Sequence, residues 1–262
     1  NQPKEFEMIS YTWMAEAINE NKEKCYLDNE QYLSQLVGKI PDHIDTIVDL
    51  GCGPGLILEA AKRLGIKAIG IELNEINANI CIANMHTVYL GKIEEVLKAT
   101  AFVETLSLQR KQGKTLFIFS NSLVYNKGIN NIIRDCIAVS SQGDYIHFND
   151  QCYGFSIRGW QQFLFNWSNG KMKFTLSPYS IKILSTSLGL DCISSLAKKG
   201  RYRGLFRVKQ KHQPRGKYSH ILSSFLFLWC LLLLNIDHFL YFSLHFLTRF
   251  KDRLPNFVTF TK

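Results

Sequence analysis

The sequence lacks the cysteine patterns of metal-binding and disulfide-rich proteins. Its seven cysteines are scattered, and no two of them stand in a C-x-x-C pair: Cys25, Cys52, Cys81, Cys136, Cys152, Cys192 and Cys230. An odd, scattered set favours a reducing compartment over a disulfide framework or a zinc site, so no metal is predicted. Residues 1–45 also lack the basic start and apolar stretch of a signal peptide, and we expect a chain that is exposed to the cytosol.

Outside one short segment the chain has no excess of charge of either sign. Nine of its 31 Lys and Arg residues lie within 198–217, with no Asp or Glu among them. The remainder holds 22 basic and 22 acidic residues, so this segment supplies the whole net charge of +9. The length of 262 residues and a hydrophobic content of 46% permit one α/β domain with an extended end.

The most informative segment is Thr46-Ile-Val-Asp-Leu-Gly-Cys-Gly-Pro-Gly55, an apolar strand that runs into three alternate glycines. Glycines permit a tight turn and close approach of a ligand to the backbone, and the helix that we expect from residue 55 would face the same ligand. Glu72 follows at the end of a second apolar run, where a carboxylate can accept both hydroxyls of a ribose. A dinucleotide motif, G-x-G-x-x-G, would require glycine at position 56, and Leu56 stands there.

This segment resembles the first motif of the class I S-adenosylmethionine-dependent methyltransferases, and Glu72 matches the acidic end of their second strand. Residues 173–181, with Ser177 as N-cap and Pro178 at the first helical position, resemble the entry to the last helix in the subgroup that methylates quinones and other small molecules. The resemblance implies S-adenosylmethionine as cofactor, with Asp49 near the amino acid head group and Glu72 on the ribose. The cofactor-binding residues that it implies are Asp49, Gly51, Cys52, Gly53, Gly55, Glu72, Leu73, Ser120 and Asn121.

Strands and helices alternate along the chain, which predicts a mostly parallel sheet covered on both faces. Strands are expected from residue 46 and at 67–73, 87–90, 115–120, 144–148 and 190–197, and helices at 11–38, 55–64, 77–85, 94–110, 129–139 and from Pro178. Two segments compete for the final strand: 205–209 and 257–262. The resemblance implies a doubly wound, Rossmann-like α/β fold with seven strands. The predicted divisions are a helical preface or lid (1–45), the methyltransferase domain (46–197) and a basic, hydrophobic end (198–262).

Candidate catalytic residues lie near the ends of the fourth and fifth strands, where ligands bind in sheets of this type. They are Tyr125, His147 and Asp150, of which Asp150 is best placed and His147 is more simply read as a core residue. The chain departs from the family at three places. Gly91 and Lys92 replace an acidic adenine contact, no Glu-His pair follows the fourth strand, and the (Asp/Asn)-Pro-Pro-(Tyr/Phe) signature of amino methylation is absent there.

A hydrophobic segment follows the basic one. Residues 221–234 contain no charge, and after Asn235-Ile-Asp-His238 the apolar character continues to residue 247. Fourteen residues are too few for a span of about 20, so we expect two short helices that form a hairpin. Basic residues on both sides favour attachment to the cytoplasmic face of a membrane through 221–247, although a buried helix pair and a single span stay open.

These observations predict methyl transfer to an oxygen of a lipid-like or lipid-linked small-molecule acceptor at a membrane surface with anionic lipid. RNA methylation is an alternative, because Tyr202, Phe206 and Tyr218 are interleaved with the basic residues. The adjoining apolar segment makes nucleic acid an unlikely partner. A non-catalytic membrane adaptor that keeps the fold is the third hypothesis, and the intact Asp49, glycines and Glu72 argue against it.

Overall fold

The computed structural model describes residues 21–110, 112–122, 129–151, 178–198 and 201–209. These residues belong to one compact unit, which extends from Asn1 to Lys211. A second unit, His212–Lys262, lies outside the described residues, as does the predicted hydrophobic hairpin. No helix within the described ranges is long and apolar enough to span a bilayer.

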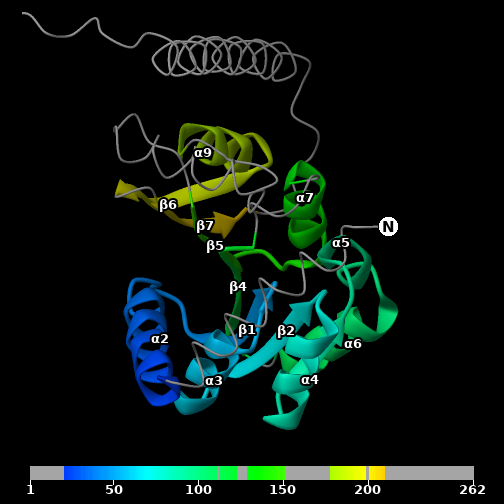
Figure 1. Ribbon diagram of the computed structural model, residues 1–262. Helices are drawn as coiled ribbons and strands as arrows, with labels where there is room; N and C mark the ends of the chain where they lie inside the picture. Colours follow the sequence, from blue (N-terminus) through cyan, green and yellow to red (C-terminus); the bar gives the residue numbers. More distant parts are fainter. Residues whose placement is uncertain (1–20, 111, 123–128, 152–177, 199–200, 210–262) are drawn as a thin grey trace, which may run out of the picture. The chain divides into compact units, whose positions relative to one another are not determined.

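Seven strands form one sheet in the order β3-β2-β1-β4-β5-β7-β6, in which β7 alone runs against its neighbours (Figure 1). The strands are β1 (Ile44–Leu50), β2 (Lys67–Glu72), β3 (Thr87–Leu90), β4 (Lys114–Ser120), β5 (Tyr145–Gln151), β6 (Leu190–Lys198) and β7 (Arg201–Val208). This confirms the predicted Rossmann-like, mostly parallel sheet of seven strands. The strand order reverses between β1 and β4, and ligands bind outside the carboxyl ends of strands at such a switch point.

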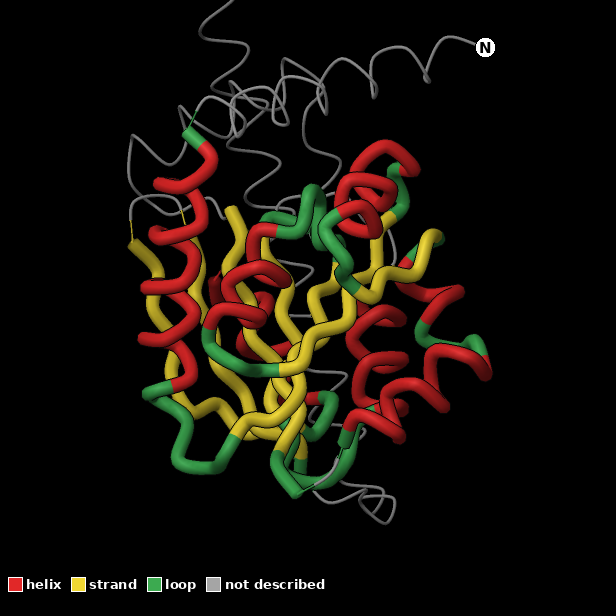
Figure 2. The backbone as a smooth tube through the Cα atoms, turned by 90° about the horizontal axis from the view of Figure 1, so that it is seen from below, coloured by secondary structure: helices red, strands yellow, loops and turns green. Residues whose placement is uncertain are grey.

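Helices cover both faces of the sheet (Figure 2). The helices are α2 (Lys22–Val37), α3 (Leu56–Arg63), α4 (Glu75–Ala83), α5 (Ile93–Val96), α6 (Thr100–Gln109), α7 (Ile129–Val139) and α9 (Pro178–Ser187). On one face, Leu33 and Leu36 of α2 pack with Ile47, Ile118 and Leu205 of the sheet. We call this the α2 face. On the other face, α5, α6, α7 and α9 share a larger core with the side chains of Phe117, Phe148 and Phe206 among others.

Three boundaries differ from the sequence-based expectation. The helix expected at 94–110 is two helices, α5 and α6, separated at residues 97–99. The final strand of the described sheet is β7, at 201–208, which overlaps the first of the two candidate segments. Strand β5 continues to Gln151 and does not end at residue 148, because its backbone stays paired with β7 as far as Arg201. As a result, Asp150 lies within a strand and does not follow it.

Candidate cofactor and acceptor site

The glycine loop connects β1 to α3 at the switch point of the sheet, and its first and third glycines are required for packing. The backbone N–H groups of Gly51 and Cys52 both donate to the Ile71 carbonyl, which holds the loop against β2. A Cβ on Gly51 would lie 2.6 Å from the Ser122 Cβ, and one on Gly55 would lie 2.9 Å from the Cys81 Sγ. Neither position leaves room for a side chain.

Gly53, the middle glycine, has a different environment. Its φ is +53°, and apart from its chain neighbours no atom of the described residues lies within 4 Å of the position that a Cβ would take. Its N–H donates to Oε2 of Glu72 over 2.7 Å, so the loop and the end of β2 are held together. The space in front of Gly53 is therefore open to a ligand that approaches the backbone closely.

Glu72 is only 6% exposed and accepts a second hydrogen bond at Oε1, from the Asn74 N–H at 2.7 Å. Each oxygen of a carboxylate has two acceptor positions, so Glu72 retains one on each oxygen for a pair of hydroxyls. Leu73 follows at the end of β2 and is 64% exposed, which offers an apolar surface beside the carboxylate. This arrangement fits a ribose with an attached base.

Asp49 is buried at the carboxyl end of β1, with 2% of its surface exposed. Its Oδ1 has no hydrogen-bond partner among the described residues. Burial, and then the nearby charge of Glu72, raise the pKa of Asp49 to about 8. A buried carboxylate without a partner is costly, and a cationic group of a ligand would offset that cost.

Together these residues fit S-adenosylmethionine. Asp49 would hold the ammonium of its amino acid head group, Gly53 would admit the ligand to the backbone, and Glu72 would hold the ribose. Cys52 contributes its backbone only, because its side chain is buried with Leu58 and Cys81 under the loop. Within the described ranges no group of three or more His, Cys, Asp or Glu side chains is placed to hold a metal ion.

Ser120 and Asn121, also predicted to contact the cofactor, end β4 next to this site. The Asn149 amide lies 3.5 Å from Ser120 Oγ, and Arg201 donates to Asn121 Oδ1 at 2.5 Å. The strand register aligns Ser120 with Asn149 and Arg203 in one row across β4, β5 and β7. Residues in register point to the same face of a sheet, so this row lies on the α2 face.

The three catalytic candidates are placed differently. His147 is in register with Ile118, which is in register with Asp49, so His147 and Asp49 lie on the same face. Asp150 is 1% exposed and is in register with Tyr202, on the opposite face. Tyr125 lies outside the described residues. Because side chains alternate along a strand, the extension of β5 places Asp150 away from the row that contains Asn149.

Tyr32, which lies on α2 above this row, was not among the residues predicted from the sequence. Its hydroxyl is 2.7 Å from Nε2 of His147, and the Arg203 guanidinium lies 5.7 Å from the centre of its ring. Burial raises the pKa of Tyr32 above its usual value and lowers the pKa of His147 to about 3. The tyrosine is thus a protonated phenol and the histidine a neutral imidazole at pH 7. The one signal in the sequence is that Tyr32 adjoins Leu33 and Leu36, whose spacing marks the buried side of a helix.

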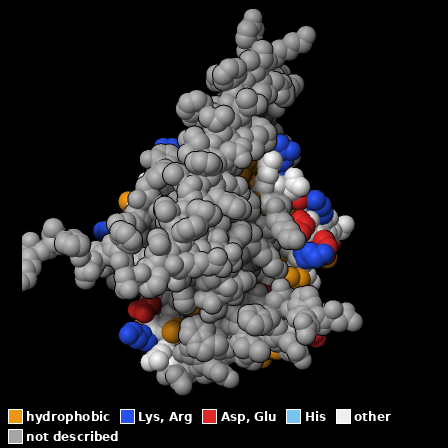
Figure 3. Space-filling view, turned by 45° about the horizontal axis from the view of Figure 1, so that its top comes forward, with side chains coloured by type: hydrophobic (Ala, Val, Ile, Leu, Met, Phe, Trp, Pro, Cys, Tyr) orange, Lys and Arg blue, Asp and Glu red, His pale blue; other side chains and the backbone are white. Residues whose placement is uncertain are grey.

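The basic segment does not form a single nucleic-acid surface in the part of the chain that the structure describes. Tyr202 and Phe206, which suggested base stacking, are both fully buried in the core, so they cannot stack on bases. Arg207 pairs with Asp42 at 3.1 Å, and Lys209 pairs with Asp191 at 2.6 Å. Figure 3 likewise shows basic and acidic side chains close to one another on the visible part of the described surface.

Comparisons with solved structures agree with this fold. The fold is similar to that of an S-adenosylmethionine-dependent methyltransferase from Archaeoglobus fulgidus, with a TM-score of 0.53 and 17% identity over 68% of this chain and 92% of that one. An O-methyltransferase family protein from Burkholderia thailandensis has a TM-score of 0.57 and 10% identity, over 81% of this chain and 64% of that one. The chain thus has the fold of the class I methyltransferases.

Sequence comparison points to one group within this class. The ubiquinone biosynthesis O-methyltransferase of Nitrosomonas europaea is 22% identical over 166 residues, which cover 61% of this chain and 68% of the relative. The protein of the same name from Stutzerimonas stutzeri is 23% identical, over 59% of this chain and 66% of the relative. No protein-family model matches the chain. The comparisons confirm the prediction of a class I methyltransferase. They also confirm the predicted enzyme class and S-adenosylmethionine as the cofactor.

Proposed function

We propose that this chain transfers a methyl group from S-adenosylmethionine to a hydroxyl oxygen of a small-molecule acceptor. The observation that carries the proposal is the buried Asp49 carboxyl group, whose Oδ1 has no hydrogen-bond partner among the described residues, beside the open backbone at Gly53 and the Glu72 carboxylate. This set suits a ligand with an ammonium group and a ribose. The names of the sequence relatives support oxygen as the methylated atom and a quinone precursor as the kind of acceptor.

The bound cofactor supplies a methyl group that is already activated by its sulfonium. The protein then has to position the acceptor hydroxyl and exclude water, and a strong base is optional. The structure agrees with a modest role in proton transfer, because a histidine whose pKa is about 3 is a weak base. Ser120 and Asn149 lie in the row that runs from β4, next to the proposed cofactor site, across β5 to β7. Both side chains can form hydrogen bonds with an acceptor hydroxyl and so position it in this row.

The experiment that tests this function is a methyl-transfer assay on the purified full-length chain. With S-adenosylmethionine and a panel of catechols, we expect S-adenosylhomocysteine to form together with a product that is heavier by 14 daltons. The control uses matched aromatic amines in place of the catechols and shows whether oxygen or nitrogen is methylated. Methylated amines without methylated catechols would contradict transfer to oxygen.

We also propose that the acceptor is lipid-like and is reached at a membrane surface. The support is in the sequence, where the apolar stretch 221–234 is preceded by the basic segment 198–217 and followed by Arg249, Lys251 and Arg253. Basic residues near anionic lipid contribute about 1 kcal/mol each, and apolar burial adds to this attraction. On this proposal the attachment is at the cytoplasmic face of the membrane.

The membrane proposal predicts that the full-length chain sediments with vesicles that contain anionic lipid. High salt should weaken this attachment without eliminating it, because salt screens the charges but does not affect the apolar burial. Deletion of residues 219–250 should release a soluble protein that still binds S-adenosylmethionine. A full-length chain that stays monodisperse without detergent and does not sediment would show that the apolar segment is buried within the protein.

A further inference from the structure

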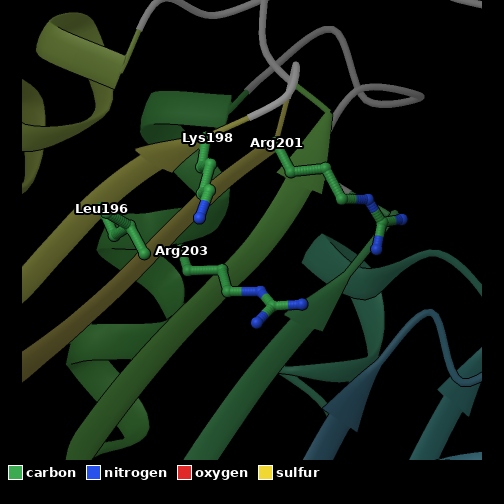
Figure 4. Close-up of a pocket in the computed structure, with 4 residues that line it drawn as sticks. All are labelled: Leu196, Lys198, Arg201 and Arg203. Atoms are coloured by element: carbon green, nitrogen blue, oxygen red, sulfur yellow. The ribbon is translucent and has the colours of Figure 1, made fainter.

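A hollow of about 310 Å³ lies at the β6–β7 edge of the sheet, and four side chains of the described residues line it (Figure 4). They are Leu196, Lys198, Arg201 and Arg203. The register pairs Arg201 with Lys198 and Arg203 with Leu196 across the two strands, so all four lie on one face. We call this group the β7 cation cluster.

The cluster places like charges next to one another without an acid. Like charges directly opposite in neighbouring strands destabilise a sheet. Among the described residues, no carboxylate forms an ion pair with Lys198, Arg201 or Arg203. The basic residues at the opposite end of the same strands are paired, Arg207 with Asp42 and Lys209 with Asp191. Among the described residues, the basic side chains near the start of β7 therefore lack acidic partners, whereas Arg207 and Lys209 near its end have them.

The end of β7 that begins at Arg201 lies beside the candidate site. Because β7 is antiparallel to β5, its first residues lie at the carboxyl ends of the parallel strands. Arg203 continues the row of Ser120 and Asn149 on the α2 face, and Arg201 donates to Asn121 directly after β4. Figure 4 shows both guanidinium groups extending away from β6 across the neighbouring strand.

A second observation indicates a ligand on this row. Asn149 is 5% exposed, and its Oδ1 has no hydrogen-bond partner among the described residues. Asn149 lies one strand from Arg203 and one strand from Ser120, or about 5 Å in each direction. A molecule bound along the row would place a hydroxyl near Asn149 and another group at the cluster.

We infer that the β7 cation cluster binds an anionic group of the methyl acceptor, a carboxylate or a phosphate, while the hydroxyl to be methylated lies toward Asn149 and Asp49. Arginine pairs with both anions through two parallel hydrogen bonds, and the adjacent lysine adds a point charge. The inference rests on the proposed function and names the class of its substrate: an acidic, hydroxylated small molecule. The anion would also remove the repulsion between Arg201 and Lys198.

Binding to the full chain loaded with S-adenosylhomocysteine tests this inference without requiring turnover. Calorimetry with 3,4-dihydroxybenzoate and with its neutral amide compares two ligands of the same shape. We expect the acid to bind at least about tenfold more tightly, the size of one charge-assisted contact. A third ligand, 3,4-dihydroxyphenyl phosphate, decides between the two anions, since the preferred one should bind most tightly.

Two variants locate the site. Arg203→Gln should remove most of the preference for the acid, whereas Arg207→Gln, on the same strand and face but paired with Asp42, should leave it unchanged. Equal binding of acid and amide, or an equal effect of the two variants, would overturn the inference. So would a loss of binding to anionic vesicles in Arg203→Gln with no effect on the soluble acids, since the cluster would then contact lipid headgroups. Methylation of neutral catechols alone would overturn the inference and leave the proposed function intact.

Discussion

Gly53→Val is expected to weaken the binding of S-adenosylmethionine by more than about 100-fold, the factor that some 3 kcal/mol represents. In the part of the chain that the structure describes, no atom beyond the neighbouring residues lies within 4 Å of the Cβ position of this valine. We propose that the cofactor approaches the backbone in this space. The loss should be visible by calorimetry on the purified variant.

The matched control is Gly65→Val. Gly65 has a φ of +71°, and its Cβ position is likewise free of described atoms within 4 Å other than those of its chain neighbours, but it lies in the turn after α3, before β2 begins. Both variants place a β-branched residue in left-handed backbone, so both should lose similar stability. Only Gly53→Val should lose cofactor binding. If the two variants bind S-adenosylmethionine equally well, the cofactor does not lie against Gly53.

Asp49→Asn is expected to stabilise the protein without cofactor and to weaken cofactor binding by about tenfold or more, the usual size of one charge-assisted contact. The wild-type carboxyl has a pKa of about 8 in the folded state, far above its ordinary value of 3.8. The folded state therefore binds more protons than the unfolded state between about pH 4 and pH 8, and stability falls as the pH rises through this range. An asparagine has no such charge to bury.

Melting temperatures measured at several pH values test whether the stability of the wild type falls as the pH rises. The Tm of Asp49→Asn should exceed that of the wild type by a margin that grows from about pH 4 to about pH 8 and then becomes constant. Asp144→Asn is the control, because Asp144 is equally buried but is paired with Arg110 at 2.7 Å and accepts the Thr115 N–H. That variant should have a lower Tm than the wild type. A lower Tm for Asp49→Asn as well would contradict an unpartnered charge at this position.

The cofactor half of the site was predictable because its requirements are local. The turn after β1 demands glycines at Gly51 and Gly55, where the neighbouring atoms leave no space, and one acid must end β2. A single stretch of chain therefore carries the signal. The same locality explains why the strands before residue 140 were placed to within one or two residues, as their apolar runs are bounded by turns or glycines.

The acceptor half was less predictable because it depends on long-range pairing. Residues Asn149, Asp150 and Gln151 are polar and read as a loop, but pairing with β7 keeps them in the strand and decides which of them share a face with Asp49. The contact between Tyr32 and His147 joins residues 115 positions apart, which no local pattern records. The break between α5 and α6 contains neither glycine nor proline, so a single long helix was the natural prediction.

Calorimetry on the wild-type chain tests the central claim most directly. S-adenosylmethionine and S-adenosylhomocysteine should each bind with one site per chain, and NADH should give no heat of binding, because the loop carries Leu56 where a dinucleotide motif needs glycine. Binding of NADH with no binding of S-adenosylmethionine would contradict the account, since the glycine loop, Asp49 and Glu72 would then serve a different cofactor.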